Sequence, residues 1–179
     1  MKDILIRPLE SKDAEQYIDL ANLVWRVAYK DIFTDVVFEW RESKRGKMIE
    51  TLAQNVKNGG DSFNYVAEYD GKIIGFVSGM IGTKYEYFND EQNYAEFGGM
   101  YIHPDYQGMG IGSRFKSMFV EWAKQKGIKK LGIGVLKDNK HARMIYEKWG
   151  GKLEDCKLQS EIKGEKYEEV FYTYDLQKM

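Results

Sequence analysis

A glycine-rich segment, Gln107-Gly108-Met109-Gly110-Ile111-Gly112-Ser113, combines residue types and spacing that suit anion binding. It follows an expected strand and precedes an expected helix. In such a turn the backbone N–H groups can approach an anion closely, and the helix N-terminus adds partial positive charge. Phosphate or pyrophosphate is therefore the ligand that this segment suits best.

Other interpretations of the segment need different residues. A nucleotide P-loop requires Gly-Lys-Ser/Thr, and no lysine precedes Ser113. A dinucleotide fingerprint requires a third glycine at position 113, and it usually lies at the first strand–helix turn of a fold. The glycines alone leave open a tight turn whose small residues serve only packing.

Residues around the segment narrow the choice. A hydrophobic strand followed by Gln107-x-x-Gly110-x-Gly112 closely resembles the signature of the GCN5-related N-acetyltransferase (GNAT) family, Gln/Arg-x-x-Gly-x-Gly/Ala. A second block is similar to that family too, with Ile145 in place of a frequent aromatic residue and Gly151 in place of a frequent Phe: Asn139-x-x-Ala142-x-x-Ile145-Tyr146-Glu147-Lys148-x-Gly150. The resemblance covers about residues 60–152.

The resemblance implies a layered α/β (α+β) fold, with a mixed, mostly antiparallel and splayed central sheet flanked by helices. It also implies acetyl-CoA as the acetyl donor. In the family the CoA pyrophosphate lies on the loop and helix N-terminus matched here, and the pantetheine arm pairs with the preceding strand. The positions that match cofactor-binding residues are Met100, Tyr101, Ile102, Gln107, Gly108, Met109, Gly110, Ile111, Gly112, Ser113, Asn139, Ala142 and Tyr146.

Two matched residues would carry the chemistry. Glu96 lies fourteen residues before Gly110, at the position of the catalytic glutamate in the members that use one, and would accept the amine proton directly or through water. Tyr146 matches the family tyrosine near the CoA sulfur, and a phenol with a pKa of about 10 can protonate the leaving thiolate. Backbone N–H groups near Met100–Tyr101 would polarise the thioester oxygen. A solvated carboxylate and a packed helix tyrosine are the open alternatives.

The acceptor side of the site is expected in the first helices and in the loop 82–95. Glu86 and Tyr87 of that loop, together with Trp25 and Tyr29, offer carboxylate and aromatic faces that suit an amine cation. A solvated loop and core aromatics would explain the same residues. The sequence leaves open a polyamine, an amino-acid-like amine, an antibiotic amine or a peptide N-terminus.

Hydrophobic periodicity and turn residues predict the elements that position these residues. Ser11 is expected to cap the first long helix, and Gly46 is expected to break an irregular helical stretch over 36–56. The expected strands are 4–7, a hairpin of 63–69 and 72–80 around Asp70-Gly71, then 96–102, 129–136 and a final pair within 152–176. Helices are expected after residues 107–112 and over 139–149.

The length and the charge of the chain limit its number of domains and the classes of function open to it. We expect one domain over residues 1–179, with acceptor-side elements in 1–58, an acetyl-CoA-binding core in 60–152 and C-terminal strands in 153–179. The net charge of −1 excludes a globally basic nucleic-acid binder, although residues 103–148 carry a local net charge of +6. Within that segment, Arg114, Lys140 and Arg143 could meet CoA phosphates.

Other classes of protein are disfavoured. No apolar stretch is long enough to span a membrane, and a single cysteine, Cys156, supplies no metal framework, so we expect no membrane, no metal and a cytoplasmic location. The sequence predicts an acetyl-CoA-dependent N-acetyltransferase that acts directly on a small-molecule or peptide amine. A catalytically inactive CoA-binding regulatory module is the alternative, a nucleotide-binding oxidoreductase rests only on the glycines, and a homodimer is left open.

Overall fold

The computed structural model describes residues 3–83, 85 and 94–179 of the chain. Its strands are β1 (Leu5–Pro8), β2 (Ser62–Tyr69), β3 (Lys72–Ile81), β4 (Tyr94–Ile102), β5 (Lys130–Leu136), β6 (Lys152–Leu153), β7 (Leu158–Ile162) and β8 (Glu165–Asp175). Its α-helices are α1 (Ala14–Tyr29), α2 (Asp35–Ser43), α3 (Arg45–Asn58), α4 (Ile111–Gln125) and α5 (Lys140–Lys148). Two short 3-10 helices, η1 (Ser11–Asp13) and η4 (Pro104–Tyr106), precede α1 and α4.

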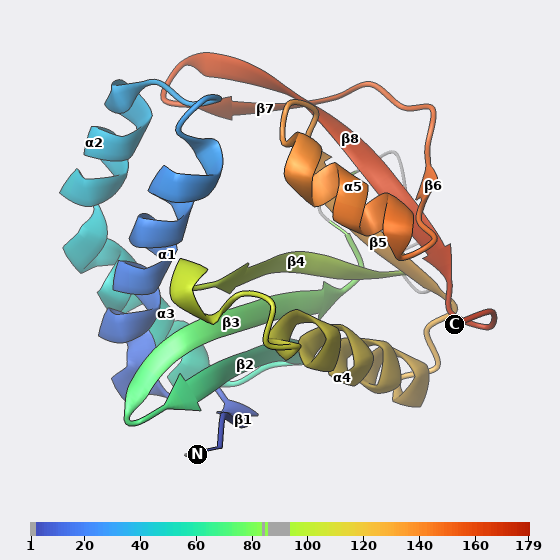
Figure 1. The fold of residues 1–179 in the computed structure, drawn as a ribbon, viewed down its shortest axis with the longest axis horizontal. Helices are drawn as coiled ribbons and strands as arrows, with labels where there is room; N and C mark the ends of the chain where they lie inside the picture. The colour runs from blue at the N-terminus through green and yellow to red at the C-terminus, as the bar shows by residue number, and fades with distance from the viewer. Residues whose placement is uncertain (1–2, 84, 86–93) are drawn as a thin grey trace. The chain divides into compact units, whose positions relative to one another are not determined.

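Eight strands among the described residues form one mixed sheet. Their order is β1-β2-β3-β4-β5-β8-β6, with β7 paired to β8 (Figure 1). β4 and β5 run parallel, whereas β1 runs antiparallel to β2, and β8 runs antiparallel to β5, β6 and β7. The predicted α/β fold, with a mixed and mostly antiparallel sheet flanked by helices, is confirmed.

The chain contacts group into two compact units. The first comprises residues 1–78 and 99–116, and the second comprises residues 79–98 and 117–179. β3, β4 and α4 each continue from one unit into the other. The residues predicted to act on the substrates are therefore distributed over both units.

Apolar side chains of α1 build the core of the first unit. Leu20, Ala21 and Val24 of α1 are buried against Val66 of β2 and Phe76 of β3, because helical spacing places these α1 residues on one face. α1 also packs against α2 and α3 (Figure 1). The predicted hairpin between β2 and β3 is confirmed, and its turn residues Asp70 and Gly71 have φ angles of 53° and 75°, as in a tight two-residue turn.

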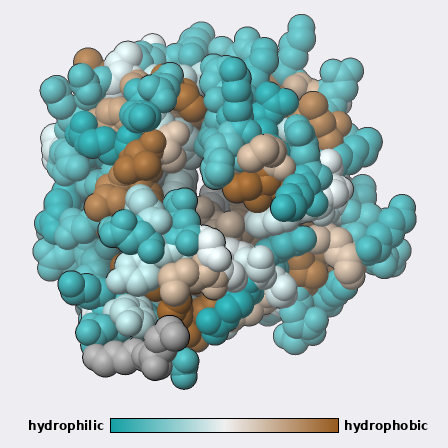
Figure 2. Space-filling model, in the orientation of Figure 1, coloured by the Kyte–Doolittle hydropathy of each residue, from teal (hydrophilic) through white to brown (hydrophobic). Residues whose placement is uncertain are grey.

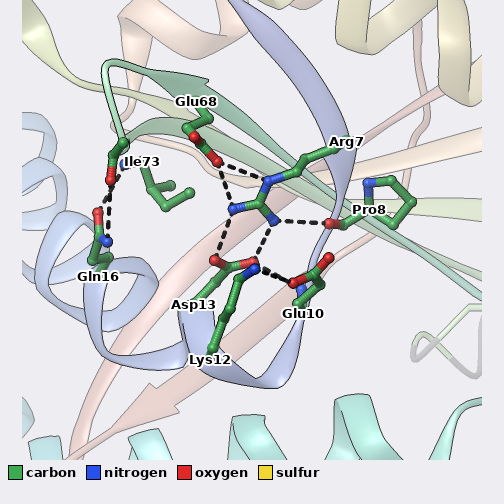
Figure 3. Close-up of polar contacts among 9 residues, drawn as sticks. Arg7, Pro8, Glu10, Lys12, Asp13, Gln16, Glu68 and Ile73 are labelled. Carbon is green, nitrogen blue, oxygen red and sulfur yellow. Dashed lines mark hydrogen bonds and ion pairs between the residues drawn. The ribbon is translucent and has the colours of Figure 1, made fainter.

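A charged network fixes the start of α1 to the sheet. The guanidinium of Arg7 in β1 donates to both carboxylate oxygens of Asp13, at 2.6 and 2.8 Å, and to Glu68 of β2 at 2.8 Å (Figure 3). The same Asp13 carboxylate accepts the backbone N–H of Glu10, which completes a capping box around η1. Ser11 lies inside η1, so its predicted role as the helix cap is wrong.

In the second unit, β8 pairs with β5, β6 and β7. Its residues Phe171 and Tyr172 are fully buried, and Phe171 packs with Tyr94 of β4 and with Tyr85. A tight turn at Lys163-Gly164 joins β7 to β8, since Ile162 pairs directly with Glu165. This arrangement confirms the predicted C-terminal strand pair.

Several element boundaries differ from the sequence prediction. Gly46 lies in the first turn of α3, and the break between α2 and α3 falls at Lys44 instead. β4 starts at Tyr94, two residues before Glu96, so Glu96 is inside the strand and not at its start. α4 starts at Ile111 and therefore includes Gly112 and Ser113.

Hydrophilic residues cover most of the molecular face in Figure 2, with hydrophobic residues in scattered positions between them. Large hydrophobic side chains that are exposed include Leu23 and Val27 of α1 and Val36 of α2. Among the described residues, the helices are too short or too polar to cross a membrane.

Candidate functional site

The glycine-rich segment forms the connection between η4 and α4 in the first unit. Gln107 directs its Nε2 group back to the carbonyl of Ile102, to which it donates at 3.2 Å. Gly108 and Gly110 have φ angles of 76° and 79°, in a region where residues with a Cβ atom are strained. His103 shapes this turn, as its Nδ1 accepts the N–H of Asp105 at 3.3 Å. The backbone here adopts a conformation that specifically favours glycine.

α4 begins within this segment. The N–H of Arg114 donates to the carbonyl of Gly110 at 3.1 Å, which marks the first turn of the helix. The amides of the preceding residues in that turn cannot be satisfied within the helix, and the helix dipole adds positive potential around them. Two positive-φ glycines followed by a helix N-terminus form an arrangement that can bind phosphate oxygens.

Gly112 has a packing role. A Cβ atom at Gly112 would lie 3.2 Å from Cε of Met100 and 3.5 Å from Cδ1 of Ile102. Met100 and Ile102 therefore point toward α4, on the same side of β4, as strand alternation predicts. Glycine at this position lets the start of α4 approach β4, the strand along which the family resemblance predicts the pantetheine arm.

Two of the basic residues expected near phosphates already have protein partners. Arg114 donates to the carbonyl of Ile4 at 3.2 Å. In the second unit, Arg143 donates to the hydroxyl of Tyr172 at 3.1 Å and to the carbonyl of Lys137 at 3.0 Å. Arg143 therefore helps to hold α5 against β8.

Glu96 lies in the second unit as a buried carboxylate. Only 4% of its surface is exposed, so the alternative of a solvated strand-end carboxylate is wrong. The Thr83 hydroxyl donates to Oε2 of Glu96 at 2.7 Å, and the backbone N–H of Tyr85 donates to the Thr83 hydroxyl at 3.2 Å. This chain of hydrogen bonds orients the carboxylate, and Thr83 is a partner that the sequence analysis did not identify.

α5 carries the second motif of the sequence. Oδ1 of Asn139 accepts the N–H of Ala142 at 3.1 Å, so Asn139 caps the N-terminus of α5. Tyr146 is half-buried, and its ring centroid lies 5.7 Å from that of Trp149 and 6.1 Å from that of Tyr172. Its backbone carbonyl accepts the Tyr174 hydroxyl at 2.9 Å. The helix that bears Tyr146 is thus held in place by aromatic packing and by hydrogen bonds to β8.

The predicted acceptor-side aromatics Trp25 and Tyr29 lie together in the first unit. Their ring centroids are 5.2 Å apart, and the Tyr29 hydroxyl lies 3.0 Å from that of Tyr101. The guanidinium carbon of Arg41 in α2 lies 4.1 Å from the centroid of the Trp25 ring. One face of Trp25 therefore already contacts a cation of the protein itself, which the sequence analysis missed. Glu86 and Tyr87 fall outside the described residues.

Burial controls the titration of this aromatic group. Burial raises the pKa of the Tyr17 hydroxyl and that of the Tyr101 hydroxyl, so both stay protonated at neutral pH. Burial also lowers the pKa of Arg41, although an arginine remains charged at physiological pH. Within residues 3–83, 85 and 94–179, no group of three or more His, Cys, Asp or Glu side chains is arranged to hold a metal ion.

Comparison with known proteins gives consistent matches. The model of the Acetyltransferase (GNAT) family matches residues 17–151. A spermidine N(1)-acetyltransferase of Thermoplasma acidophilum is 28% identical over 168 residues, which cover 92% of this chain and 98% of that protein. An uncharacterized N-acetyltransferase of Archaeoglobus fulgidus is 29% identical over 134 residues, which cover 68% of this chain and 87% of that protein.

Solved structures of N-acetyltransferases are also similar to this chain. The crystal structure of the PaiA N-acetyltransferase from Thermoplasma acidophilum, in complex with coenzyme A, is 25% identical to this chain with a TM-score of 0.75. The match covers 97% of this chain and 99% of the PaiA chain. An N-acetyltransferase structure from Staphylococcus aureus matches with a TM-score of 0.70 and 20% identity, over 97% of this chain and 99% of that one, and shows the fold alone.

Proposed function

Since the chain belongs to the GNAT acetyltransferase family and is an acyltransferase, we propose that it transfers an acetyl group from acetyl-CoA directly to a primary amine. The acceptor is the amine of a small molecule or peptide. The observation that carries the proposal furthest is the backbone of Gly108 and Gly110 at the start of α4, which suits the diphosphate of CoA.

Acetyl-CoA supplies the activated acetyl thioester in this proposal. The residues present fit its diphosphate, because a positive-φ turn followed by a helix N-terminus presents backbone N–H groups without needing a basic side chain. The similar PaiA structure contains coenzyme A, which supports the same ligand for this chain. Met100, Tyr101 and Ile102 offer the strand backbone along which the pantetheine arm would lie.

Glu96 is the proposed proton acceptor. A protonated amine is not a nucleophile, so the reaction needs a group that removes its proton. The carboxylate of Glu96 is buried, and Thr83 holds one of its oxygens by a hydrogen bond of 2.7 Å. A carboxylate whose orientation is fixed in this way is prepared to accept a proton from the amine, directly or through a water molecule.

Tyr146 is the proposed proton donor to the departing thiolate. Its place in α5 is fixed by ring contacts to Trp149 and Tyr172 and by the bond from Tyr174 to its carbonyl. A phenol keeps its proton at neutral pH and can release it to a thiolate that forms nearby. Asn139, which caps the same helix, retains its Nδ2 group as a donor for the pantetheine arm.

Cys156 argues against a covalent acyl-enzyme. Burial and the neighbouring carboxylates of Glu154 and Asp155 raise the pKa of its thiol, so less of the reactive thiolate exists at neutral pH. Cys156 is the single cysteine of the chain. Direct transfer between acetyl-CoA and amine in a ternary complex therefore suits this protein better than a cysteine intermediate.

The CoA assignment can be tested with a matched pair of variants. Gly110→Glu and Gly59→Glu each place a side chain at a positive φ angle, 79° and 69°, with no neighbouring atom within 4 Å of the added Cβ. Only Gly110→Glu should weaken CoA binding in calorimetry, by at least about tenfold, because the carboxylate opposes the diphosphate, whereas Gly59→Glu should leave the affinity unchanged. Unchanged affinity in folded Gly110→Glu would reject the assignment.

A further inference from the structure

Arg41 is a partly buried arginine whose guanidinium is held by a neutral amide and an aromatic ring. Its Nε donates to Oδ1 of Asn22 at 2.7 Å, and its guanidinium lies over the ring of Trp25. Burial lowers its pKa, whereas the neighbouring carboxylate of Glu42 and nearby tyrosine hydroxyls act in the opposite direction. Among residues 3–83, 85 and 94–179, no carboxylate lies within ion-pair distance of it.

Two other arginines of the first unit are paired with carboxylates. Arg7 binds the carboxylates of Asp13 and Glu68, and Arg45 binds those of Asp19 and Glu15. A charge withdrawn from water is stabilised by a directly bonded anion, and among the described residues no carboxylate occupies that place at Arg41.

The groups around Arg41 reinforce this reading. Asn22 is 8% exposed, and because its Oδ1 accepts from Arg41, its Nδ2 faces the other way and has no acceptor in the described part of the chain. The hydroxyls of Tyr17, Tyr29 and Tyr101 contribute to the electrostatics of the same guanidinium, and burial keeps Tyr17 and Tyr101 neutral. The cluster therefore holds one buried donor without an acceptor among the described residues, Asn22 Nδ2, beside one positive charge.

We propose that Arg41 binds a carboxylate of the acceptor, so that the substrate is an amine that also carries a carboxylate, as an amino acid or a short peptide does. This proposal rests on the proposed acetyltransferase function and names its acceptor class. The two terminal nitrogens of the guanidinium remain after Nε has bonded Asn22, and they match the two oxygens of a carboxylate. Trp25 and Asn22 hold the guanidinium plane, while Trp25 and Tyr29 are the aromatics assigned to the acceptor.

This class differs from that of the similar spermidine acetyltransferase. A polyamine carries only positive charge, and a poorly hydrated guanidinium repels it at short range. An amine with a carboxylate instead gains a charge-assisted hydrogen bond at Arg41. The acceptor would thus be recognised by its negative group, with its amine left available for acetylation.

The test compares matched acceptors with saturating acetyl-CoA. The panel consists of the common L-amino acids, the same amino acids as carboxamides, dipeptides, spermidine and spermine, with thiol release as the readout. We expect the best acceptor to carry a carboxylate and to exceed its own amide in kcat/KM by at least about tenfold. Comparing dipeptides with free amino acids shows whether the preferred carboxylate belongs to a peptide or to a free amino acid.

Arg41→Gln should abolish this preference. Activity with the carboxylate acceptor should fall by about 10²-fold, whereas activity with the amide should change little. Arg26→Gln is the control, because Arg26 of α1 lies over the Phe38 ring at 4.9 Å and makes a similar cation–π contact on an exposed part of the helix. Arg41→Lys keeps the charge but not the planar fork, and it replaces Arg41→Gln if that variant fails to fold.

Calorimetric titration of the CoA-saturated protein with the same amino acids separates the two proposals. Arg41-dependent binding without acetyl transfer would refute the acetyltransferase proposal and support the carboxylate site. Acetylation in which spermidine or the amides match the best carboxylate acceptor would overturn the Arg41 proposal and leave the enzymatic function standing. An unchanged preference in folded Arg41→Gln would overturn it equally.

Discussion

Glu96 combines two properties that a solvated strand-end carboxylate lacks: burial and a fixed hydrogen bond from Thr83. If it accepts the amine proton, Glu96→Gln should lower kcat by about 10²-fold at neutral pH, because glutamine keeps the shape but not the basicity. The loss of kcat in the variant should become smaller toward pH 9, because more of the acceptor amine is already neutral there. A kcat–pH profile over pH 6–9 measures this, and wild-type turnover throughout would reject the role.

Tyr146 can be examined by removing one oxygen atom. Tyr146→Phe keeps the ring contacts to Trp149 and Tyr172, so folding and acetyl-CoA affinity should barely change. Turnover should fall, as expected for an interaction made mainly in the transition state. An activated thioester, whose thiolate needs no proton, should show a smaller loss than acetyl-CoA. Equal losses with both donors would assign Tyr146 to cofactor positioning instead.

At the scale of elements, the pair Arg7–Asp13 ties η1 and α1 to the first strands. The Arg7 guanidinium lowers the pKa of Asp13 below its ordinary value of 3.8. A depressed folded pKa stabilises the fold fully above the unfolded value, and this stabilisation is lost as the pH falls through the lower folded value. Asp13→Asn should therefore lower the free energy of unfolding by about 3 kcal/mol at pH 7 and by progressively less below pH 4.

Urea denaturation at several pH values measures this difference. Lys12→Gln is the control, since the Lys12–Glu10 pair is exposed and its loss should leave the denaturation midpoint unchanged. A deficit in Asp13→Asn that stayed constant from pH 7 down to pH 2 would show that the charge of Asp13 does not stabilise the fold.

α4 approaches β3 closely at Gly79. A Cβ atom there would lie 2.2 Å from the Phe119 ring and 3.0 Å from the Glu96 carbonyl, so Gly79→Ala should destabilise the fold by about 1–3 kcal/mol. Gly46→Ala in α3 meets nothing within 4 Å and should instead stabilise by about 0.5–1 kcal/mol. Thermal denaturation of both variants measures these changes in stability. Equal changes in the two variants would contradict the close packing of Gly79 against the Phe119 ring.

Periodicity predicted most elements because it reports burial. Ile111, Phe115 and Phe119 recur every four residues, and all three are buried on α4. Helix caps and breaks were less predictable. Ser11 has the right residue type for a cap, but η1 begins at Ser11, and Asp13, held by Arg7, accepts the N–H of Glu10. That competition involves β1 and β2, which local sequence does not reveal.

Some residues of the candidate site could be predicted from the sequence, and others could not. The glycines of the loop were identifiable because backbone geometry limits which residues fit there. Thr83 and Arg41 were not, because each acquires its role through a partner far along the chain: Glu96 for Thr83, and Asn22 and Trp25 for Arg41. A hydroxyl or guanidinium carries no spacing signal until tertiary contacts bring it to its partner.

In the molecule as a whole, positive and negative residues are unevenly distributed along the chain. The net charge is −1, while residues 103–148, which include the glycine-rich segment and the start of α5, carry +6. Arg114 and Arg143 bond protein carbonyls and a hydroxyl, so part of this charge supports the fold. The remainder gives the segment proposed to hold an anionic cosubstrate a positive bias, and CoA binding should weaken as ionic strength rises.

A titration with CoA at two salt concentrations measures that dependence. Affinity should decline from 50 mM to 500 mM sodium chloride, although the backbone contacts of the loop keep binding detectable. Affinity that is independent of salt would mean that the +6 segment is ordinary solvated surface.

Acetyl transfer to an amine is measured most directly by following free CoA thiol and acetylated amine together in one reaction. With acetyl-CoA and the amine panel, we predict equal amounts of thiol and singly acetylated product by mass spectrometry, neither of which forms without the protein or without the amine. CoA binding accompanied by no acetylated product for any amine would contradict the account and identify the protein as a CoA-binding module.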